Sequence, residues 1–270
     1  MNAMGSQVPK LSVRGATKVY ATASGQLLAI DDCSLDVRAG EIVSIVGPSG
    51  CGKTTLLWSM SGLHGLSAGE VLLDGRAITG PDPAIGMVFQ DANLLPWRNV
   101  QANINFPFEI KGTKPDRQWI DELLHKVGLE GFGARFPGEL SGGMQQRAAL
   151  VRALSYKPSV LLMDEPFGAL DAFTREEMNR LVEEIWLETH TTIVLITHSI
   201  EEAVFLSDRV IVLSARPGRV AKEYDVPFPR PRSLDVMATK EAFDLMNAIK
   251  REIVGNQKSR FDAAPSTPAN

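Results

Sequence analysis

The 270-residue sequence has only two cysteines and no long uninterrupted run of apolar residues. Cys33 and Cys51 have no metal-binding spacing and form no disulfide framework, which favours a reducing cytosol. No apolar run approaches the roughly 18 residues that a membrane span needs. The N-terminus lacks the basic start and apolar stretch of a signal peptide. These absences predict a cytosolic globular chain without a membrane span.

An excess of positive charge is missing as well. The chain has 28 Lys and Arg against 32 Asp and Glu, which gives a formal net charge of −4. Proteins that bind nucleic acid use Lys and Arg to neutralise phosphates, so this balance argues against a nucleic-acid partner. A hydrophobic fraction of 44% and a charged fraction of 22% are ordinary for a soluble protein with a well-filled core.

Four short apolar runs, rich in β-branched residues, are typical of strands buried on both faces of a parallel sheet. The runs are 42–46, 160–163, 192–196 and 210–213. Helical patterns separate them. Apolar residues recur with helical spacing in Thr174–Thr189, and Ser199-x-x-Glu202 predicts a capping box that opens a helix through Leu206. Alternating strands and helices of this kind predict an α/β fold with a mainly parallel sheet.

Other stretches predict additions to this core. Residues 11–37 alternate in polarity and break at Gly25, which predicts a small antiparallel sheet. Residues 91–156 are rich in helical pattern and lack buried strand runs, so we expect an inserted helical subdomain. Residues 226–258 form a C-terminal extension, in which an amphipathic segment near 234–254 predicts a helix. The flanking residues, 1–9 and 259–270, have the composition of disordered tails.

A phosphate-binding loop is the most specific motif. It fits G-x-x-x-x-G-K-[ST], follows the predicted strand 42–46 and precedes a predicted helix from Thr54 to about Gly62. Its glycines let backbone N–H groups point at phosphate oxygens, and the helix N-terminus adds partial positive charge. We expect Lys53 to reach the β- and γ-phosphates and the Thr54 hydroxyl to bind Mg²⁺. The candidate nucleotide-binding residues are Gly47, Pro48, Ser49, Gly50, Cys51, Gly52, Lys53, Thr54 and Thr55.

Two carboxylates, Asp164 and Glu165, follow the apolar run 160–163. A buried strand places its last residues at the carboxyl edge of the sheet, where α/β proteins bind ligands. We expect Asp164 to hold the Mg²⁺ shell and Glu165 to orient or deprotonate a water. An acidic N-cap for the next helix is the alternative. The phosphate loop upstream favours the metal, because paired carboxylates at a strand end cost desolvation energy unless a cation lies nearby.

Together with further segments, these motifs resemble the ATP-binding subunit of ABC transporters. Residues 140–145, Leu-Ser-Gly-Gly-Met-Gln, are similar to the family's LSGGQ signature, with Met144 where the final Gln is usual. The resemblance implies that Ser141, Gly142 and Gly143 bind ATP. Ser141 is also a good N-cap for a helix to about Ser155, so a plain loop and cap is the alternative.

Four more residues occupy positions that matter in this family. Gln90, after the strand-like run 85–89, matches the glutamine that senses the γ-phosphate and metal. His198, after the predicted strand 192–197, matches the switch histidine, whose imidazole can bond a γ-phosphate. Asp171 matches the loop that crosses the dimer interface, with a helix cap as the alternative. Tyr20 matches the aromatic residue that stacks on adenine, and a packed strand tyrosine is the competing interpretation.

The resemblance covers roughly residues 10–225 and implies an ABC ATPase domain with a P-loop NTPase (RecA-like) core. It implies ATP and Mg²⁺ as cofactors. The residues implied are Thr54, Gln90 and Asp164 at the metal and Lys53, Gln90, Glu165 and His198 at the reacting phosphate. In this family two subunits trap ATP head to tail, between the phosphate loop of one and the signature of the other. A second copy, or a homologous subunit, is therefore an expected partner.

An ATPase of this kind without a membrane span implies a multi-span membrane permease on another chain. Leu94, Leu95 and Trp97 lie just after Gln90 and suit a docking groove for a short helix of that permease. Packing inside the helical subdomain is the alternative for these side chains. The resemblance also implies a periplasmic or extracellular solute-binding protein, and a peripheral location on the cytoplasmic face of the bacterial cell membrane.

Segments 94–100, 213–220 and 227–232 look like those of importers for nitrate, sulfonates and taurine. A solvated basic surface is the alternative for the arginines of the last two segments, which are Arg216, Arg219, Arg230 and Arg232. Two other functions compete with the importer. An ABC ATPase that acts on nucleic acid or ribosomes is disfavoured by the single cassette and the negative charge. A binding-only cassette with degraded chemistry has Met144 as its only support.

Overall fold

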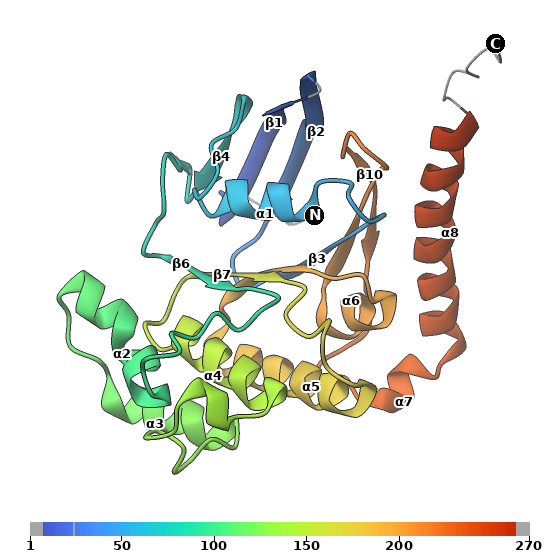
Figure 1. The fold of residues 1–270 in the computed structure, drawn as a ribbon. Coiled ribbons are helices and arrows are strands. Elements are labelled where there is room, and N and C mark those ends of the chain that lie inside the picture. The colour runs from blue at the N-terminus through green and yellow to red at the C-terminus, as the bar shows by residue number, and fades with distance from the viewer. Residues whose placement is uncertain (1–7, 24, 263–270) are drawn as a thin grey trace.

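The computed structural model describes residues 8–23 and 25–262, which form two sheets with helices packed around them (Figure 1). The larger sheet has the strand order β10-β9-β3-β8-β7-β6. Its strands are β3 (Ile42–Val46), β6 (Ile85–Val88), β7 (Val160–Asp164), β8 (Thr192–Ile196), β9 (Arg209–Leu213) and β10 (Val220–Asp225). All neighbours pair in parallel except the edge strand β10, which is antiparallel to β9. The predicted α/β fold is confirmed.

Every residue of β3, β7 and β8 is buried, which is why these strands carry uninterrupted apolar runs. The predicted strands 42–46 and 192–196 are confirmed at both ends. Strand β10 has no counterpart among the strands predicted from the sequence. Its segment, Val-Ala-Lys-Glu-Tyr-Asp, has no buried residue and pairs on one side only, so it lacks the apolar signature of an interior strand.

A smaller antiparallel sheet has the order β2-β1-β4-β5 and includes the hairpin predicted around Gly25. Its strands are β1 (Leu11–Thr22), β2 (Gly25–Val37), β4 (Ala68–Leu73) and β5 (Arg76–Ala77). Helix α1 (Lys53–Met60) lies between this sheet and the larger one (Figure 1). Leu56 of α1 shares one buried cluster with Leu11 of β1 and Ile45 of β3. The N-terminus of α1 is therefore fixed by both sheets.

Helices occupy the chain between β6 and β7, where the sequence predicts a helical insertion. They are α2 (Val100–Lys111), α3 (Arg117–Lys126), the short 3₁₀ helix η1 (Pro137–Glu139) and α4 (Gly142–Leu154). Helix α5 (Ala172–Thr189) follows β7. Ile104, Leu123 and Leu150 of the insertion bury their side chains in the same cluster as Leu161 of β7. The insertion is thereby packed against the sheet that carries the carboxylates.

The C-terminal part contains α6 (Ile200–Leu206), α7 (Leu234–Met237) and α8 (Lys240–Asp262). Ser199 caps α6 as predicted, but the capping box is incomplete because the Ser199 N–H donates to Thr197 Oγ1 and not to Glu202. Helix α8 extends through residues 259–262, which the sequence analysis assigns to a tail, while 1–7 and 263–270 lie outside the described residues. No helix in the described part of the chain has the length and apolarity needed to cross a membrane.

Two of the four arginines considered as a solvated basic surface are in fact buried. Arg230 forms ion pairs with Glu183 and Asp208, and its side chain is only 9% exposed. The Arg232 guanidinium donates to the carbonyl oxygens that end α6, those of Val204, Phe205 and Ser207. Burial, together with the Arg230 charge, lowers the pKa of Arg232 to about 10. The solvated interpretation is therefore wrong for Arg230 and Arg232.

We predict that Arg232→Ala destabilises the protein by about 3–5 kcal/mol, because it leaves the last carbonyl oxygens of α6 without their donor and removes a buried cation that faces Asp208. Urea unfolding at pH 7 measures the change. The matched control is Arg219→Ala, which removes a solvent-exposed pair with Asp31 and should cost less than about 1 kcal/mol. Equal midpoints for the two variants would contradict the assigned role of Arg232.

Candidate nucleotide site

The parallel sheet gathers the predicted site residues at one edge. Strands β3, β8, β7 and β6 are successive neighbours, and their carboxyl ends point the same way. Ile45 and Asp164 both pair with Ile196 in register, and Val88 pairs with Met163. The phosphate loop, His198, Glu165 and Gln90 follow these strands in that spatial order. Ligands of α/β proteins bind at this kind of edge.

The phosphate loop turns through backbone conformations that require glycine. Gly52 has φ 106°, and a Cβ there would lie 2.8 Å from the Ala29 carbonyl oxygen. Lys53 is only 7% exposed, and its Nζ donates to the carbonyl oxygens of Gly47 at 3.0 Å and Pro48 at 3.1 Å. The described hydrogen-bond partners of this ammonium are neutral carbonyls, and no ion pair with a carboxylate is found among the described residues. It lies over the loop, where an anion can bind.

Thr54 and Asp164 come together as the sequence predicts. The Thr54 hydroxyl donates to Asp164 Oδ1 across 3.1 Å, which joins the start of α1 to the end of β7. Asp164 is 7% exposed, and burial raises the pKa of its carboxyl, assisted by the neighbouring Glu165 charge. A buried carboxylate beside a hydroxyl is a pair of oxygen donors of the kind that Mg²⁺ prefers. The residues present therefore fit the predicted metal.

Glu165 and His198 form a second pair at the same edge. Glu165 Oε2 lies 3.1 Å from His198 Nδ1, and the Glu165 N–H donates to the carbonyl oxygen of Ile196. Glu165 has φ 44°, which turns its side chain away from the direction of β7. The His198 side chain is 57% exposed and that of Glu165 24%. Both groups can therefore reach a molecule bound outside the sheet.

Gln90 is exposed, but its backbone is held by the helical insertion. Gln146 of α4 donates its Nε2 hydrogen to the Gln90 carbonyl oxygen. Arg152, also on α4, donates to the carbonyl oxygens of Ala92 and Asn93. A movement of α4 would therefore displace the segment that carries Gln90. No motif in the sequence points to Gln146 or Arg152, and their place in the helix that Ser141 begins is the signal that the sequence offers.

Tyr20 lies beside the helix that the phosphate loop opens. Its hydroxyl lies 3.4 Å from Thr55 Oγ1 and 3.3 Å from His64 Nδ1. The His64 ring in turn meets the Trp58 ring edge-on, with centroids 4.8 Å apart. Tyr20 is thus both a packed strand residue and a neighbour of the loop. Its stacking on adenine stays a prediction.

The signature residues and Asp171 lie away from the phosphate loop. Ser141 caps α4 by accepting the Met144 N–H, and Asp171 caps α5 by accepting the Thr174 N–H and hydroxyl. A Cβ on Gly143 would lie 3.2 Å from Thr174 Cγ2, so the two caps are adjacent. The contacts described for Ser141 and Asp171 do not reach the loop. Within one chain, both capping alternatives are realised.

Arg216 contacts the phosphate loop, a role that the sequence analysis missed. Its Nε donates to the Gly50 carbonyl oxygen at 2.9 Å. The Gly218 N–H donates to the carbonyl oxygen of Ala29, so this turn also contacts β2. The signal available was position: the turn follows β9, which pairs directly with β3. Arg216 is exposed, yet it is tied to the loop.

Fold and site together define a P-loop NTPase with a helical insertion. Residues 30–168 match the family described as ABC transporter. The fold resembles that of a bacterial ABC transporter cassette solved as a dimer, with a TM-score of 0.72 and 33% identity, covering 81% of this chain and 100% of that one. A cassette in a post-hydrolysis state bound to ADP and Pi gives the same TM-score at 32% identity, with the same coverage.

Two curated relatives are similar over most of their length. The taurine import ATP-binding protein TauB of Roseobacter denitrificans is 51% identical over 221 residues, which cover 81% of this chain and 82% of that protein. The aliphatic sulfonates import ATP-binding protein SsuB of Bacillus licheniformis is 43% identical over 231 residues, which cover 85% and 90%. The chain belongs to the ABC transporter family, as its ATP-binding subunit.

We predict that Asp164→Asn stabilises the nucleotide-free protein at pH 7. The raised pKa means that the folded state holds the Asp164 proton more readily than the unfolded chain, so the ionised carboxylate opposes folding above that pKa. An amide avoids this cost and still accepts the Thr54 hydroxyl. Each kcal/mol relieved raises the melting temperature by about 2–4 °C.

Calorimetric melting of the wild type and Asp164→Asn across pH tests this sign. The difference should be largest at neutral pH and shrink as the pH falls through the pKa of Asp164, because the wild-type carboxyl then becomes neutral. Asp121→Asn, on the exposed face of α3, is the control and should change little. A variant that melts below the wild type at pH 7 would disprove the prediction.

Proposed function

We propose that the chain is the ATP-hydrolysing subunit of an importer for taurine or a related sulfonate. The observation that carries the ATPase part is the convergence of Lys53, the Thr54–Asp164 pair and the Glu165–His198 pair at one sheet edge. The class of solute is supported by the relatives that are named for taurine and aliphatic sulfonate import. Nitrate, the third candidate from the sequence, is not named in either of these two relatives.

ATP and Mg²⁺ fit the residues of this edge. The phosphate loop at the start of α1 offers backbone N–H groups and the Lys53 ammonium to the phosphates. Thr54, Asp164 and Gln90 supply oxygen atoms for the metal. When bound, Mg²⁺ neutralises charge on the transferring phosphate. The buried Asp164 carboxylate gains a counter-charge in that state, which offsets its desolvation.

Glu165 and His198 supply the proton chemistry. The Glu165 carboxylate orients a water and accepts its proton as the water attacks the γ-phosphate. Its contact with His198 Nδ1 fixes the imidazole ring, so that Nε2 on the far side of the ring faces away from the carboxylate and can hydrogen-bond a phosphate oxygen. Charge that develops on that oxygen is then shared between His198 and Lys53.

A second copy completes the site in this proposal. The Ser141 hydroxyl and the N-terminus of α4 suit an anion, yet within one chain their contacts do not reach the phosphate loop. Phe173, two residues after Asp171, has 87% of its surface exposed, which favours a contact outside the chain. Ser141, Gly142 and Gly143 of one copy would then face the phosphate loop of the other. Met144, the next residue, is partly buried and packs against the helical core.

We predict that Glu165→Gln retains ATP binding and lowers turnover by about 10²–10⁴-fold, because the amide cannot accept the proton of the attacking water. Steady-state phosphate release and nucleotide binding with the purified chain measure the two effects. Glu184→Gln changes an exposed carboxylate on α5 and serves as the control, with turnover like the wild type. Near wild-type turnover in Glu165→Gln would remove Glu165 as the base.

The permease is proposed to dock beside the Gln90 segment. A cavity of about 610 Å³ lies between β6, α2 and α4, and its lining is largely apolar. Phe89, Leu95, Phe106 and Ile110 line it, and Ile110 is 71% exposed. An exposed apolar groove of this kind suits a short amphipathic helix. Leu94 instead packs against the helical core. The packing interpretation therefore holds for Leu94, whereas the docking interpretation is kept for Leu95.

Ile110→Asp should abolish co-purification with the permease and leave the turnover of the isolated chain unchanged, because it places a charge in the groove at an exposed residue outside the nucleotide site. Affinity capture of the co-expressed transporter measures the association. Phe243→Asp adds the same charge at an exposed phenylalanine of α8 and should not weaken it. Equal capture with both variants would exclude the groove as the docking site.

The remaining parts of the proposal follow from the importer. A periplasmic or extracellular solute-binding protein would deliver the sulfonate to the permease, and this subunit would lie on the cytoplasmic face of the membrane. In this proposal the solute passes through the permease and does not meet the nucleotide site. The specificity of uptake therefore belongs to the partner chains.

A further inference from the structure

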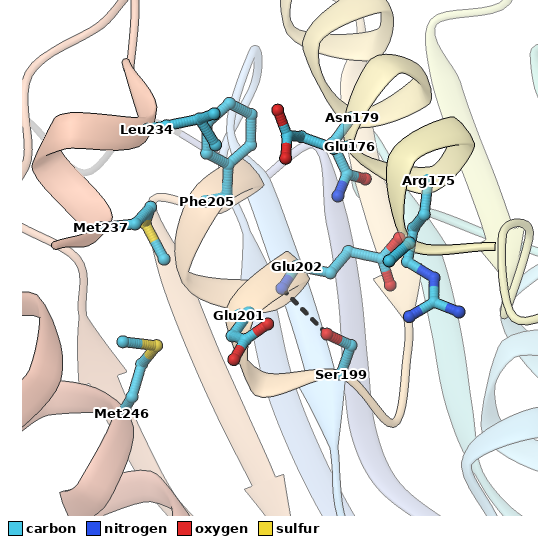
Figure 2. Close-up of a pocket in the computed structure, with 11 residues that line it drawn as sticks. Arg175, Glu176, Asn179, Ser199, Glu201, Glu202, Phe205, Leu234, Met237 and Met246 are labelled. Carbon is cyan, nitrogen blue, oxygen red and sulfur yellow. Dashed lines mark hydrogen bonds between the residues drawn. The ribbon is translucent and has the colours of Figure 1, made fainter.

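A cavity lies between α5, α6 and the C-terminal extension, outside the set of residues assigned to ATP (Figure 2). Its volume is about 310 Å³, which is the size of a small-molecule site. The lining side chains come from three parts of the chain that are far apart in sequence. Among them are Asn179 of α5, Glu202 of α6 and Met246 of α8.

Two lining side chains carry buried hydrogen-bond acceptors without a donor. Glu202 is 4% exposed and Asn179 is 8% exposed. Glu202 Oε1 and Asn179 Oδ1 are both shielded from solvent and have no hydrogen-bond partner. Buried polar atoms in proteins are nearly always paired, so two such acceptors in one wall indicate a missing donor. They reach the cavity from different helices, Asn179 from α5 and Glu202 from α6 (Figure 2).

The charge of the lining is negative. Glu176, Glu201 and Glu202 contribute three carboxyl groups against the single guanidinium of Arg175. Arg175 donates its Nε and Nη2 hydrogens to the backbone carbonyl oxygens of Phe167 and Leu170, in the loop before α5. Burial raises the pKa of Glu202, although the Thr197 hydroxyl and the Arg175 charge act in the opposite direction. Among the described residues no group donates a hydrogen bond to Glu202 Oε1, although the Arg175 side chain lies beside this carboxyl (Figure 2).

The opposite wall is apolar and belongs to the C-terminal extension. Leu234 and Met237 of α7, Met246 of α8 and Phe205 of α6 supply its apolar lining (Figure 2). Methionine side chains are flexible and polarisable, so they accommodate aliphatic chains of different shape. The cavity thus has one polar, electronegative wall and one apolar, adaptable wall.

We propose that this cavity binds a small organic cation, a primary ammonium with a short aliphatic chain. Its N–H donors complete the hydrogen bonding of Glu202 Oε1 and Asn179 Oδ1, and its positive charge offsets the surrounding carboxylates. Its aliphatic chain lies against Met237 and Met246. Ser199, which also lines the cavity, directly follows His198, so an occupant would contact the helix that begins beside the nucleotide site.

Isothermal titration of n-hexylammonium chloride into the full chain, without nucleotide, tests the proposal. We expect saturable binding with a Kd below 1 mM, the weak limit of specific small-ligand sites on the affinity scale. 1-Hexanol has the same chain without the charge and should bind at least tenfold more weakly. Hexanoate, with the opposite charge, should not bind. Absence of saturable heat with n-hexylammonium, or equal affinity for hexanoate, would overturn the proposal.

Variants of both walls locate the binding. Glu202→Gln should weaken n-hexylammonium at least tenfold, and Met246→Trp, which fills the cavity from the apolar side, should abolish binding. Glu184→Gln removes a carboxylate of α5 outside the lining and should bind like the wild type. Thermal melting verifies that each variant is folded. If Glu202→Gln is not folded, the Met246→Trp variant alone tests the location of the binding site. Wild-type affinity in a folded Glu202→Gln or Met246→Trp would place the cation elsewhere and overturn the assignment.

Discussion

The parallel pairing of β3, β8, β7 and β6 is the constraint on which the rest of the structure depends. These ladders bring the ends of four strands to one edge, although the chain reaches them at positions more than 100 residues apart. The register matters as much as the order. A slip of one residue in β7 would turn Asp164 to the other face of the sheet and break its contact with Thr54. The chemistry of the site is thus fixed by backbone hydrogen bonds between apolar strands.

Around this edge, the fold keeps charged groups in places that cost stability. Lys53 and Asp164 are almost fully buried, and burial raises the pKa of the Asp164 carboxyl. Helix α1 is held between the two sheets, and β7 is buried on both faces. The two side chains therefore cannot turn outward into solvent without a movement of these elements. A ligand that binds only the folded state recovers part of this cost, so nucleotide binding and stability are linked.

Much of this arrangement could be predicted from the sequence, because strands buried on both faces and a loop that needs glycines each leave a strong local pattern. Strands 42–46 and 192–196 and the caps at Ser141 and Ser199 are examples. Partners that meet only in three dimensions leave no such pattern. The burial of Arg232 against the end of α6, the bond from Gln146 to Gln90, and the edge strand β10 belong to this second kind. The interfaces with a second copy and with the permease do as well, since their other half lies on another chain.

Glu165 illustrates how selection acts on such a site. With φ at 44°, its backbone occupies a region that suits glycine or asparagine better than glutamate, at a cost of about 1–3 kcal/mol. A population of variants screened for heat resistance alone would therefore drift away from glutamate at this position, whereas one screened for growth on the transported solute would keep it. Comparing the residues retained under the two screens would show, position by position, which residues the chain requires for stability and which it requires for transport.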